Sequence, residues 1–278
     1  MAPSANRKPE AEPSRRLSTE RMIMRKDGPA GWMVFNNPAR RNAVSLDMWQ
    51  AVPEILDDFA QDDAVRVVVL AGAGGKAFVS GADISEFEEK RSSPEAIAHY
   101  NAIAERASNA ILACRKPTIA MIEGYCIGGG VAIALCCDLR IAAEDARFGV
   151  PAARLGLGYA YAGIARLADV VGPSFAKEIF FTARQFDAAE ALQMGLVNRV
   201  RPAAELERYV RDYAERIGAN APLTVAAVKL ALTEYVKDPE ERDLAACQAA
   251  VDACYASADY VEGRTAFMQK RKPLFRGR

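Results

Sequence analysis

The sequence has very little histidine, the side chain that most often acts as a catalytic base. A single histidine, His99, occurs in 278 residues. It lies in "EAIAHYNAIAERA", whose spacing of apolar residues predicts an amphipathic helix with His99 in contact with solvent. A Ser-His-Asp triad would have to use His99, and no G-x-S-x-G turn accompanies it. The sequence therefore argues against a triad hydrolase, with a base role for His99 as the alternative.

Metal-ligand and disulfide patterns are also missing. The six cysteines stand at positions 114, 126, 136, 137, 247 and 254, and none of them forms the paired spacing of a zinc site. Most of them lie in apolar stretches, which predicts small buried hydrophobic residues in a reducing compartment. We therefore expect no metal, no disulfide and a cytoplasmic location.

Long apolar runs and an excess of one charge are absent too. No apolar stretch reaches the length that spans a bilayer, and 36 Lys and Arg balance 36 Asp and Glu. No basic stripe interleaved with aromatic residues appears, so we expect neither a membrane nor a nucleic acid as partner. Residues 1–18 are rich in Pro, Ser, Arg and Glu, which predicts a disordered tail rather than a signal peptide.

The first two hundred residues alternate between strand-like and helix-like segments. Strands are predicted at 31–37, 65–74, 116–125 and, as a shorter piece, within 139–149. Helices are predicted from Ser45 onward, over 93–114 and over 130–138. Pro53 is expected to kink the first helix. This alternation predicts an α/β fold with crossover connections.

The remaining residues are predicted to be helical. Helix starts are expected at Ser174, Asp187 and "RPAAE", and helix ends at Gly195 and Gly218. Residues 222–236 and 243–271 have helical periodicity. We therefore divide the chain into a tail at 1–18, a core at 19–200 and a helical C-terminal region at 201–278.

Two stretches place small residues where a predicted strand ends. In "GGKAFVSGADISEF" the turn "SGAD" follows the strongest strand, and Asp83 can cap a following helix. In "GYCIGGGVAIALCCDLRIA" a helix begins at Gly128–Gly130. In both, backbone N–H groups are left without intrahelical partners, and at the glycines the helix dipole adds positive potential.

Two such N–H groups that converge on one point form an oxyanion hole. Glycine is needed there because a Cβ would keep a ligand away from the backbone. The alternative is that the three glycines only permit tight packing of a helix on a strand. They do not form G-x-G-x-x-G, which makes dinucleotide binding the weaker hypothesis.

Seven stretches occur in the order known from one family. They are "NNPARRNAVSLDM", "KAFVSGADISEF", "KPTIAMIEGYCIGGG", "CDLRIAAEDARFGVPAARLGLGY", "GLVNRV", "APLTVAAVKLAL" and "AFMQKRKPLF". On these residues the chain resembles the crotonase (enoyl-CoA hydratase/isomerase) superfamily over roughly residues 20–275. The resemblance implies a ββα spiral core, a helical C-terminal trimerisation region, and a homotrimer or a hexamer made of two trimers.

The resemblance also implies substrates carried as coenzyme A thioesters, with no permanently bound cofactor. The backbone N–H groups of Ala82 and Gly129 would stabilise an enolate-like oxyanion. Coenzyme A would lie along Arg40, Arg41, Ala43, Ser80, Asp83 and Ile84, with Phe267 and Lys270 closing over its nucleotide end, often from a neighbouring subunit. The alternative for Arg40 and Arg41 is an ordinary solvated turn.

The pattern departs from typical hydratases at two positions. Where they carry glutamates, this chain has Ala132 and Ala152, and alanine can neither accept a proton nor orient water. Tyr159 matches a tyrosine of relatives of the methylmalonyl-CoA decarboxylase type, although that branch has histidine at Ala82 and glutamate at Ala132. Tyr159 or Tyr161 could protonate an enolate or bind a carboxylate, and an aromatic wall of the acyl pocket is the alternative.

The acidic run Glu86–Glu89 could supply a distant carboxylate, with a solvated surface as the alternative. Glu86–Glu89 is expected to be a solvated helix face, and Glu123 a surface or hydrogen-bonding residue. We therefore expect an enoyl-CoA hydratase-like acyl-CoA enzyme. A decarboxylase of a malonyl-type thioester and a non-catalytic acyl-CoA-binding subunit are the alternatives.

Overall fold

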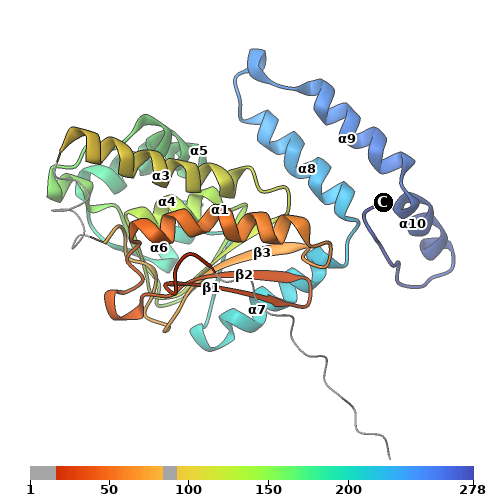
Figure 1. Ribbon diagram of the computed structural model, residues 1–278, viewed down its shortest axis with the longest axis horizontal. Helices are drawn as coiled ribbons and strands as arrows, with labels where there is room; N and C mark the ends of the chain where they lie inside the picture. The colour runs from red at the N-terminus through yellow and green to blue at the C-terminus, as the bar shows by residue number, and fades with distance from the viewer. Residues whose placement is uncertain (1–16, 84–92) are drawn as a thin grey trace, which may run out of the picture.

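Residues 17–83 and 93–278 are described by the computed structural model, and they form two sheets, flanking helices and a projecting helical arm (Figure 1). The strand orders are β1-β2-β3-β5-β7-β10 in one sheet and β4-β6-β8-β9 in the other. The strands are β1 (Met22–Asp27), β2 (Ala30–Phe35), β3 (Val67–Gly72), β4 (Ala77–Val79), β5 (Thr118–Ile122), β6 (Tyr125–Ile127), β7 (Leu139–Ala143), β8 (Arg147–Gly149), β9 (Phe186–Asp187) and β10 (Arg199–Arg201). Only β1–β2 and β8–β9 pair antiparallel among these strands. The predicted α/β class is confirmed.

The helices fall into two groups. The first group is η1 (Pro38–Arg40), α1 (Leu46–Gln61), α3 (Pro94–Leu112), α4 (Gly129–Cys136), η3 (Pro151–Leu155), α5 (Tyr161–Thr182), α6 (Ala188–Gln193) and α7 (Ala203–Gly218). The second group is α8 (Pro222–Tyr235), η4 (Pro239–Glu241), α9 (Leu244–Ala256) and α10 (Ala258–Met268). We call residues 222–278 the arm, because its helices extend away from both sheets (Figure 1), and the described residues before it the body.

Alternate residues of β3 show how the body is layered. Val68 and Leu70 point into the main core, which also contains buried residues of α1, α3 and α4. Val67 and Val69 point to the opposite face of the sheet, into a second core formed with α7. Successive side chains of a strand face opposite sides, and strands that are apolar on both faces are typical of parallel sheets covered twice.

Two predicted elements differ from the structure. Helix α1 continues through Pro53 without a break, because tertiary packing on both sides of the proline outweighs the lost hydrogen bond. The single strand predicted at 116–125 is two strands in different sheets, β5 and β6. Gly124 separates them with φ +63°, and a Cβ there would lie 2.1 Å from the Lys76 carbonyl oxygen. Only glycine fits this change of direction.

Several predicted helix boundaries agree with the structure. Asp187 caps α6 and forms a capping box with Glu190, and α7 ends at Gly218. Gly172, with φ +77°, interrupts α5 directly before the start expected at Ser174. The helices after residue 201 do not share one place: α7 packs on the six-stranded sheet, whereas α8, α9 and α10 form the arm (Figure 1).

Candidate active site

The two predicted oxyanion loops follow neighbouring strands. Strand β4 ends at Val79 and β6 ends at Ile127, and the two strands are parallel partners. The carboxyl ends of neighbouring parallel strands lie at the same edge of a sheet, which is where α/β proteins commonly bind ligands. Residues 80–83 and 128–130 are therefore brought together by the strand pairing itself.

The first loop is fixed by a short ladder to Val44. The Val44 N–H donates to the Gly81 carbonyl at 2.8 Å, and the Asp83 N–H donates to the Val44 carbonyl at 3.0 Å. In an extended segment successive N–H groups point to opposite sides, so the Ala82 N–H points away from Val44. Gly81 makes this geometry possible with φ +113°.

The three glycines of the second loop have separate roles. Gly128 adopts φ +54° directly before helix α4. The first helical hydrogen bond of α4 runs from the Ala132 N–H to the Gly128 carbonyl at 3.1 Å, which leaves the Gly129 N–H without an intrahelical acceptor. Gly130 packs against β4, because a Cβ on it would lie 2.1 Å from the Val79 carbonyl oxygen. The packing role proposed for glycine thus falls on Gly130, and the role of an exposed donor is left to Gly129.

The two loops adjoin at their free amides. A methyl group added to Gly129 would lie 3.6 Å from the Ala82 nitrogen, and one added to Gly81 would lie 4.0 Å from the Gly129 nitrogen. Within residues 17–83 and 93–278, neither the Ala82 nor the Gly129 N–H has a hydrogen-bond acceptor. Both residues are half-buried. Two unsatisfied donors at an accessible position can bind an oxyanion.

The turn before α1 lies against the first loop. The exposed Arg40 guanidinium forms an ion pair of 2.9 Å with the buried carboxylate of Asp83. Ser80 donates its N–H to the Arg41 carbonyl and its hydroxyl to the Arg40 carbonyl. Ala43 is buried beside them. The structure therefore places five of the predicted coenzyme A residues together, next to Ala82.

Two residues at this turn, Tyr125 of β6 and Asn42, were not predicted as site residues. The Arg41 guanidinium lies 4.7 Å from the ring centre of Tyr125, which belongs to β6 and leads into the glycine loop. Asn42 is fully buried, and its side chain is hydrogen-bonded to Asn37 at the start of the turn and to Ala73 and Ala77 at the two ends of the β3–β4 connection. Asparagine tolerates left-handed backbone, but this preference alone does not reveal the long-range partners of Asn42.

Other predicted residues lie elsewhere. Ile84 and Glu86–Glu89 fall outside the described residues. Phe267 and Lys270 are exposed on the arm, at α10 and directly after it, and Figure 1 shows α10 beyond α8, away from α4. Within one chain the structure does not bring these two residues to the loops.

Small and aromatic residues follow the glycine loop along the chain. Ala132 lies in the first turn of α4 and Ala152 is buried in η3. The Tyr159 ring packs at 5.0 Å, edge to face, against Phe180, and burial raises the pKa of its phenol. Tyr161 is 84% exposed, so it does not form a wall of a buried pocket within this chain.

Glu123 precedes β6, whereas the glycine loop follows that strand. A methyl group added to Gly75 would lie 3.7 Å from its carboxylate. Burial, followed by the nearby carboxylates of Asp145 and Glu207, raises the pKa of Glu123.

The part of the chain that the structure describes holds no group of three His, Cys, Asp or Glu side chains able to bind a metal, and no described helix is long and apolar enough to cross a membrane.

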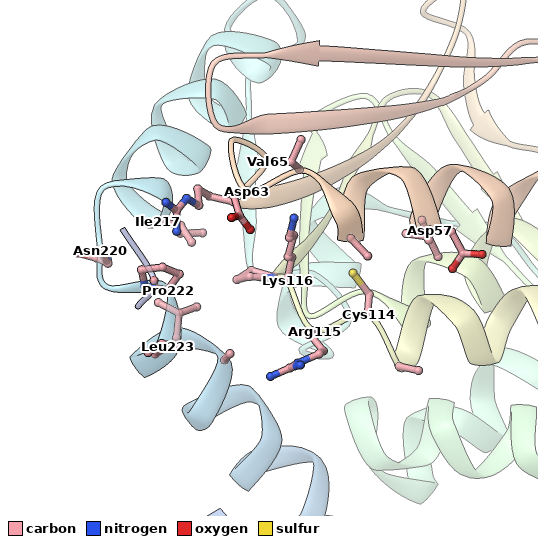
Figure 2. A pocket seen from close by; sticks show the side chains of 18 of the residues that line it. Asp57, Asp63, Val65, Cys114, Arg115, Lys116, Ile217, Asn220, Pro222 and Leu223 are labelled. Carbon is pink, nitrogen blue, oxygen red and sulfur yellow. The ribbon is translucent and has the colours of Figure 1, made fainter. Parts of the chain in front are cut away.

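A separate cavity of about 490 Å³ lies at the base of the arm. Cys114, Arg115 and Lys116, which precede β5, lie opposite Pro222 and Leu223 at the start of α8 (Figure 2). None of the predicted site residues that lie within 17–83 and 93–278 lines it. It is at the beginning of β5, whereas the oxyanion loops follow the ends of β4 and β6.

Comparison with known proteins decides the family. The model of the enoyl-CoA hydratase/isomerase family matches residues 29–278. The chain belongs to the enoyl-CoA hydratase/isomerase family. A crotonyl-CoA hydratase of Syntrophomonas wolfei is 36% identical over 259 residues, which cover 93% of this chain and 99% of that protein. A short-chain-enoyl-CoA hydratase of Clostridium acetobutylicum is 34% identical over 256 residues, with coverage of 92% and 97%.

Solved structures agree with this assignment. The crystal structure of an enoyl-CoA hydratase/carnitine racemase from Magnetospirillum magneticum superposes with a TM-score of 0.87 at 37% identity, and covers 94% of this chain and 97% of that one. The predicted crotonase fold is confirmed by this similarity.

Proposed function

We propose that this chain is an enoyl-CoA hydratase-like enzyme that binds acyl-CoA thioesters and stabilises an enolate oxyanion with the N–H groups of Ala82 and Gly129. The observation that carries the proposal is the pair of amides without acceptors on adjoining loops. Both would donate to the thioester oxygen. Negative charge grows on that oxygen as an enolate forms, so fixed donors stabilise the transition state more than the bound substrate.

Coenzyme A is the part of the substrate that the turn 40–43 would hold. The guanidinium groups of Arg40 and Arg41 are exposed, and planar guanidinium groups suit phosphate oxygens. Ser80 and Asp83 join this turn to the Ala82 loop. Binding of the nucleotide would thereby set the thioester in front of the two amides, with no permanent cofactor required.

Decarboxylation of a malonyl-type thioester is the second candidate, and Ala132, Ala152 and Tyr159 favour it. In this reaction the bond from the α-carbon to the carboxylate breaks, carbon dioxide leaves, and the electron pair passes to the thioester oxygen as an enolate. A proton from the Tyr159 hydroxyl or from water then returns to the α-carbon. No general base is needed, whereas hydration needs activated water and a proton donor.

A turnover panel separates the candidates. Purified protein is given crotonyl-CoA and methylmalonyl-CoA, and the product thioesters are identified by mass. Hydration of crotonyl-CoA supports the first candidate and shows that other groups replace the glutamates. Loss of carbon dioxide from methylmalonyl-CoA alone supports the second. Binding of both thioesters without any turnover across a wider panel favours the non-catalytic subunit and contradicts the proposal.

Two variants of Gly129 test the donor itself. Gly129→Pro removes the N–H at the first helical position, where proline is otherwise tolerated, and should lower turnover by about 10²-fold or more. Gly129→Ala keeps the N–H and adds a methyl 3.6 Å from the Ala82 nitrogen, so its loss should be smaller. Equal activity of a folded Gly129→Pro protein and the wild type would remove Gly129 from the mechanism.

We also propose a homotrimer, alone or as a pair of trimers, in the cytoplasm. An apolar groove of about 960 Å³ runs along α8, α9 and α10, and Phe267 in it is 83% exposed. Exposed apolar surface of this extent is typical of an interface, and we propose further copies of this chain as its occupant.

Val228→Asp in the groove should yield monomers in size-exclusion chromatography with light scattering. Leu192→Asp on α6, at another exposed apolar residue, should leave the assembly intact; a trimeric Val228→Asp protein contradicts this interface.

A further inference from the structure

Asn42 is the one fully buried polar residue of the turn that holds Arg40, Arg41 and Ala43. We infer that Asn42 is a positioning residue that holds the Ala82 amide in register with the Gly129 amide. This inference rests on the proposed oxyanion hole and adds to it the residue that sets its geometry. Asn42 does not touch the proposed thioester position, so it acts through the loop that it holds.

The Asn42 amide joins three backbone segments. Its Oδ1 accepts from the Asn37 N–H at 2.9 Å, and its Nδ2 donates to the Ala73 carbonyl at 2.9 Å and to the Ala77 carbonyl at 2.7 Å. Both amide hydrogens are therefore used, on carbonyls at the two ends of the β3–β4 connection. Buried polar groups left without partners are costly, so the turn and this connection are held in one relative position.

Two hydrogen-bonded paths lead from Asn42 to Ala82. Along the first, Ala77 begins β4, and the chain reaches Ala82 three residues after β4 ends at Val79. Along the second, the chain continues from Asn42 to Val44, whose N–H and carbonyl pair with Gly81 and Asp83. The strand before Ala82 and the Val44 segment that pairs with its neighbours are thus both anchored at Asn42.

The local backbone explains why asparagine stands here. Arg41 and Asn42 are consecutive left-handed residues, with φ of +51° and +56°, and asparagine tolerates this region better than other residues with a Cβ. A Cβ on Gly72 would lie 2.7 Å from the Asn42 nitrogen and 2.1 Å from the Ala77 carbonyl oxygen. Gly72 therefore leaves the space that the Asn42 amide fills.

The test uses a chromophoric thioester, para-dimethylaminocinnamoyl-CoA, at a concentration that saturates each protein. Its absorption maximum moves to longer wavelength when donors polarise the thioester carbonyl, so it reports on the oxyanion hole without turnover. Asn42→Asp keeps the shape and the acceptor for Asn37 but loses both donors. We expect it to bind the probe and to lose most of the red shift seen with wild type, and to lower turnover of an accepted substrate about 10²-fold, as small misplacements do.

The controls separate positioning from stability. Asn198→Ala removes the bond to the Arg140 N–H between β7 and β10 of the six-stranded sheet, whereas the two loops follow strands of the other sheet, and it should keep the full red shift. Asn42→Gly accepts the positive φ and serves in place of Asn42→Asp if that variant does not fold. A folded Asn42 variant with the full red shift and wild-type turnover overturns this inference. A wild-type protein that binds the probe without a red shift instead overturns the proposed oxyanion hole itself.

Discussion

The body and the arm keep their shapes by different means. In the body, α1 alone buries seven apolar residues, from Met48 to Phe59. In the arm, α9 buries none of its residues, and α8 buries only Glu234. The apolar residues of the arm are instead exposed, as Val228 at 54% and Phe267 at 83% show. The body has its own core, whereas the arm leaves its apolar face for another surface.

Carboxylates that bind backbone N–H groups hold the arm together. Asp259, which is buried, accepts from the Arg276 and Gly277 N–H groups at 2.7 Å each. Glu234 accepts from the Asp243 N–H, and Glu262 from the Leu274 N–H. Charge-assisted bonds of this kind define local geometry without an apolar core. The arm can therefore be correctly folded and still present an apolar groove.

The largest contrast between the two regions should come from a matched pair of glycines. In Gly130→Ala the new methyl would lie 2.1 Å from the Val79 carbonyl oxygen, inside the body, and should destabilise the protein by about 3 kcal/mol or more. In Gly263→Ala it would lie 3.4 Å from the Phe275 ring in the arm, and helix propensity should offset any cost to within about 1 kcal/mol. Thermal unfolding checks both; similar melting temperatures for the two variants would contradict the contrast.

A smaller effect is expected at the link between the regions. The Lys229 ammonium on α8 binds the Asp138 carboxylate at 2.7 Å and the Lys116 carbonyl at 3.1 Å. Lys229→Met keeps the aliphatic length but loses about 1.5–3 kcal/mol of charged hydrogen bonding. Hydrogen exchange should accelerate about tenfold or more in α8 and stay unchanged in β3.

Lys26→Met is the matched control, since Lys26 pairs with Asp58 and Asp62 on the body surface. Exposed pairs contribute about 0–1 kcal/mol, and exchange in α8 should not respond. Unchanged exchange in α8 of Lys229→Met would show that the arm is held by other contacts.

Acid should loosen the arm by a modest amount. Hydrogen bonding to Arg271, followed by the Leu274 N–H, lowers the pKa of Glu262 from 4.5 to about 2. The folded pKa lies below the unfolded one, so this stabilisation is present above pH 4.5 and is lost as the pH falls from 4.5 toward 2. Exchange rates of α10, corrected for their intrinsic pH dependence, should rise over this range in wild type and less in Glu262→Gln. An identical pH response of the two proteins would exclude Glu262 as the cause.

Much of the fold could be predicted from local patterns. The β-branched run at 65–74, the cap at Asp187 and the glycines at the ends of helices each produced the expected element. The short strands β4, β6 and β8 could not be predicted, because two or three residues show no periodicity and their pairing depends on partners far along the chain. Helix α1 was predicted, but its unbroken course through Pro53 was not, because long-range packing outweighs the local effect of a proline.

The candidate site divides in the same way. The two loops were predicted from strand-to-turn sequences, and the family resemblance implied Ala82 and Gly129 as the donors within them. The parallel pairing of β4 with β6 brings these loops together. Asn42 was not predicted as a site residue, because its proposed positioning role depends on hydrogen bonds to the Ala73 and Ala77 carbonyls. These carbonyls adjoin Asn42 only in the folded chain. The positions of Phe267 and Lys270 depend on where the arm lies, and no local pattern encodes that.

The most direct test is a crystal structure of the protein with a non-reactive acyl-CoA thioester bound. The account predicts that the thioester oxygen lies about 2.7–3.1 Å from both the Ala82 and the Gly129 nitrogen, with the coenzyme A phosphates near Arg40 or Arg41. A thioester whose carbonyl faces neither amide, or that occupies the cavity at the base of the arm, would contradict it.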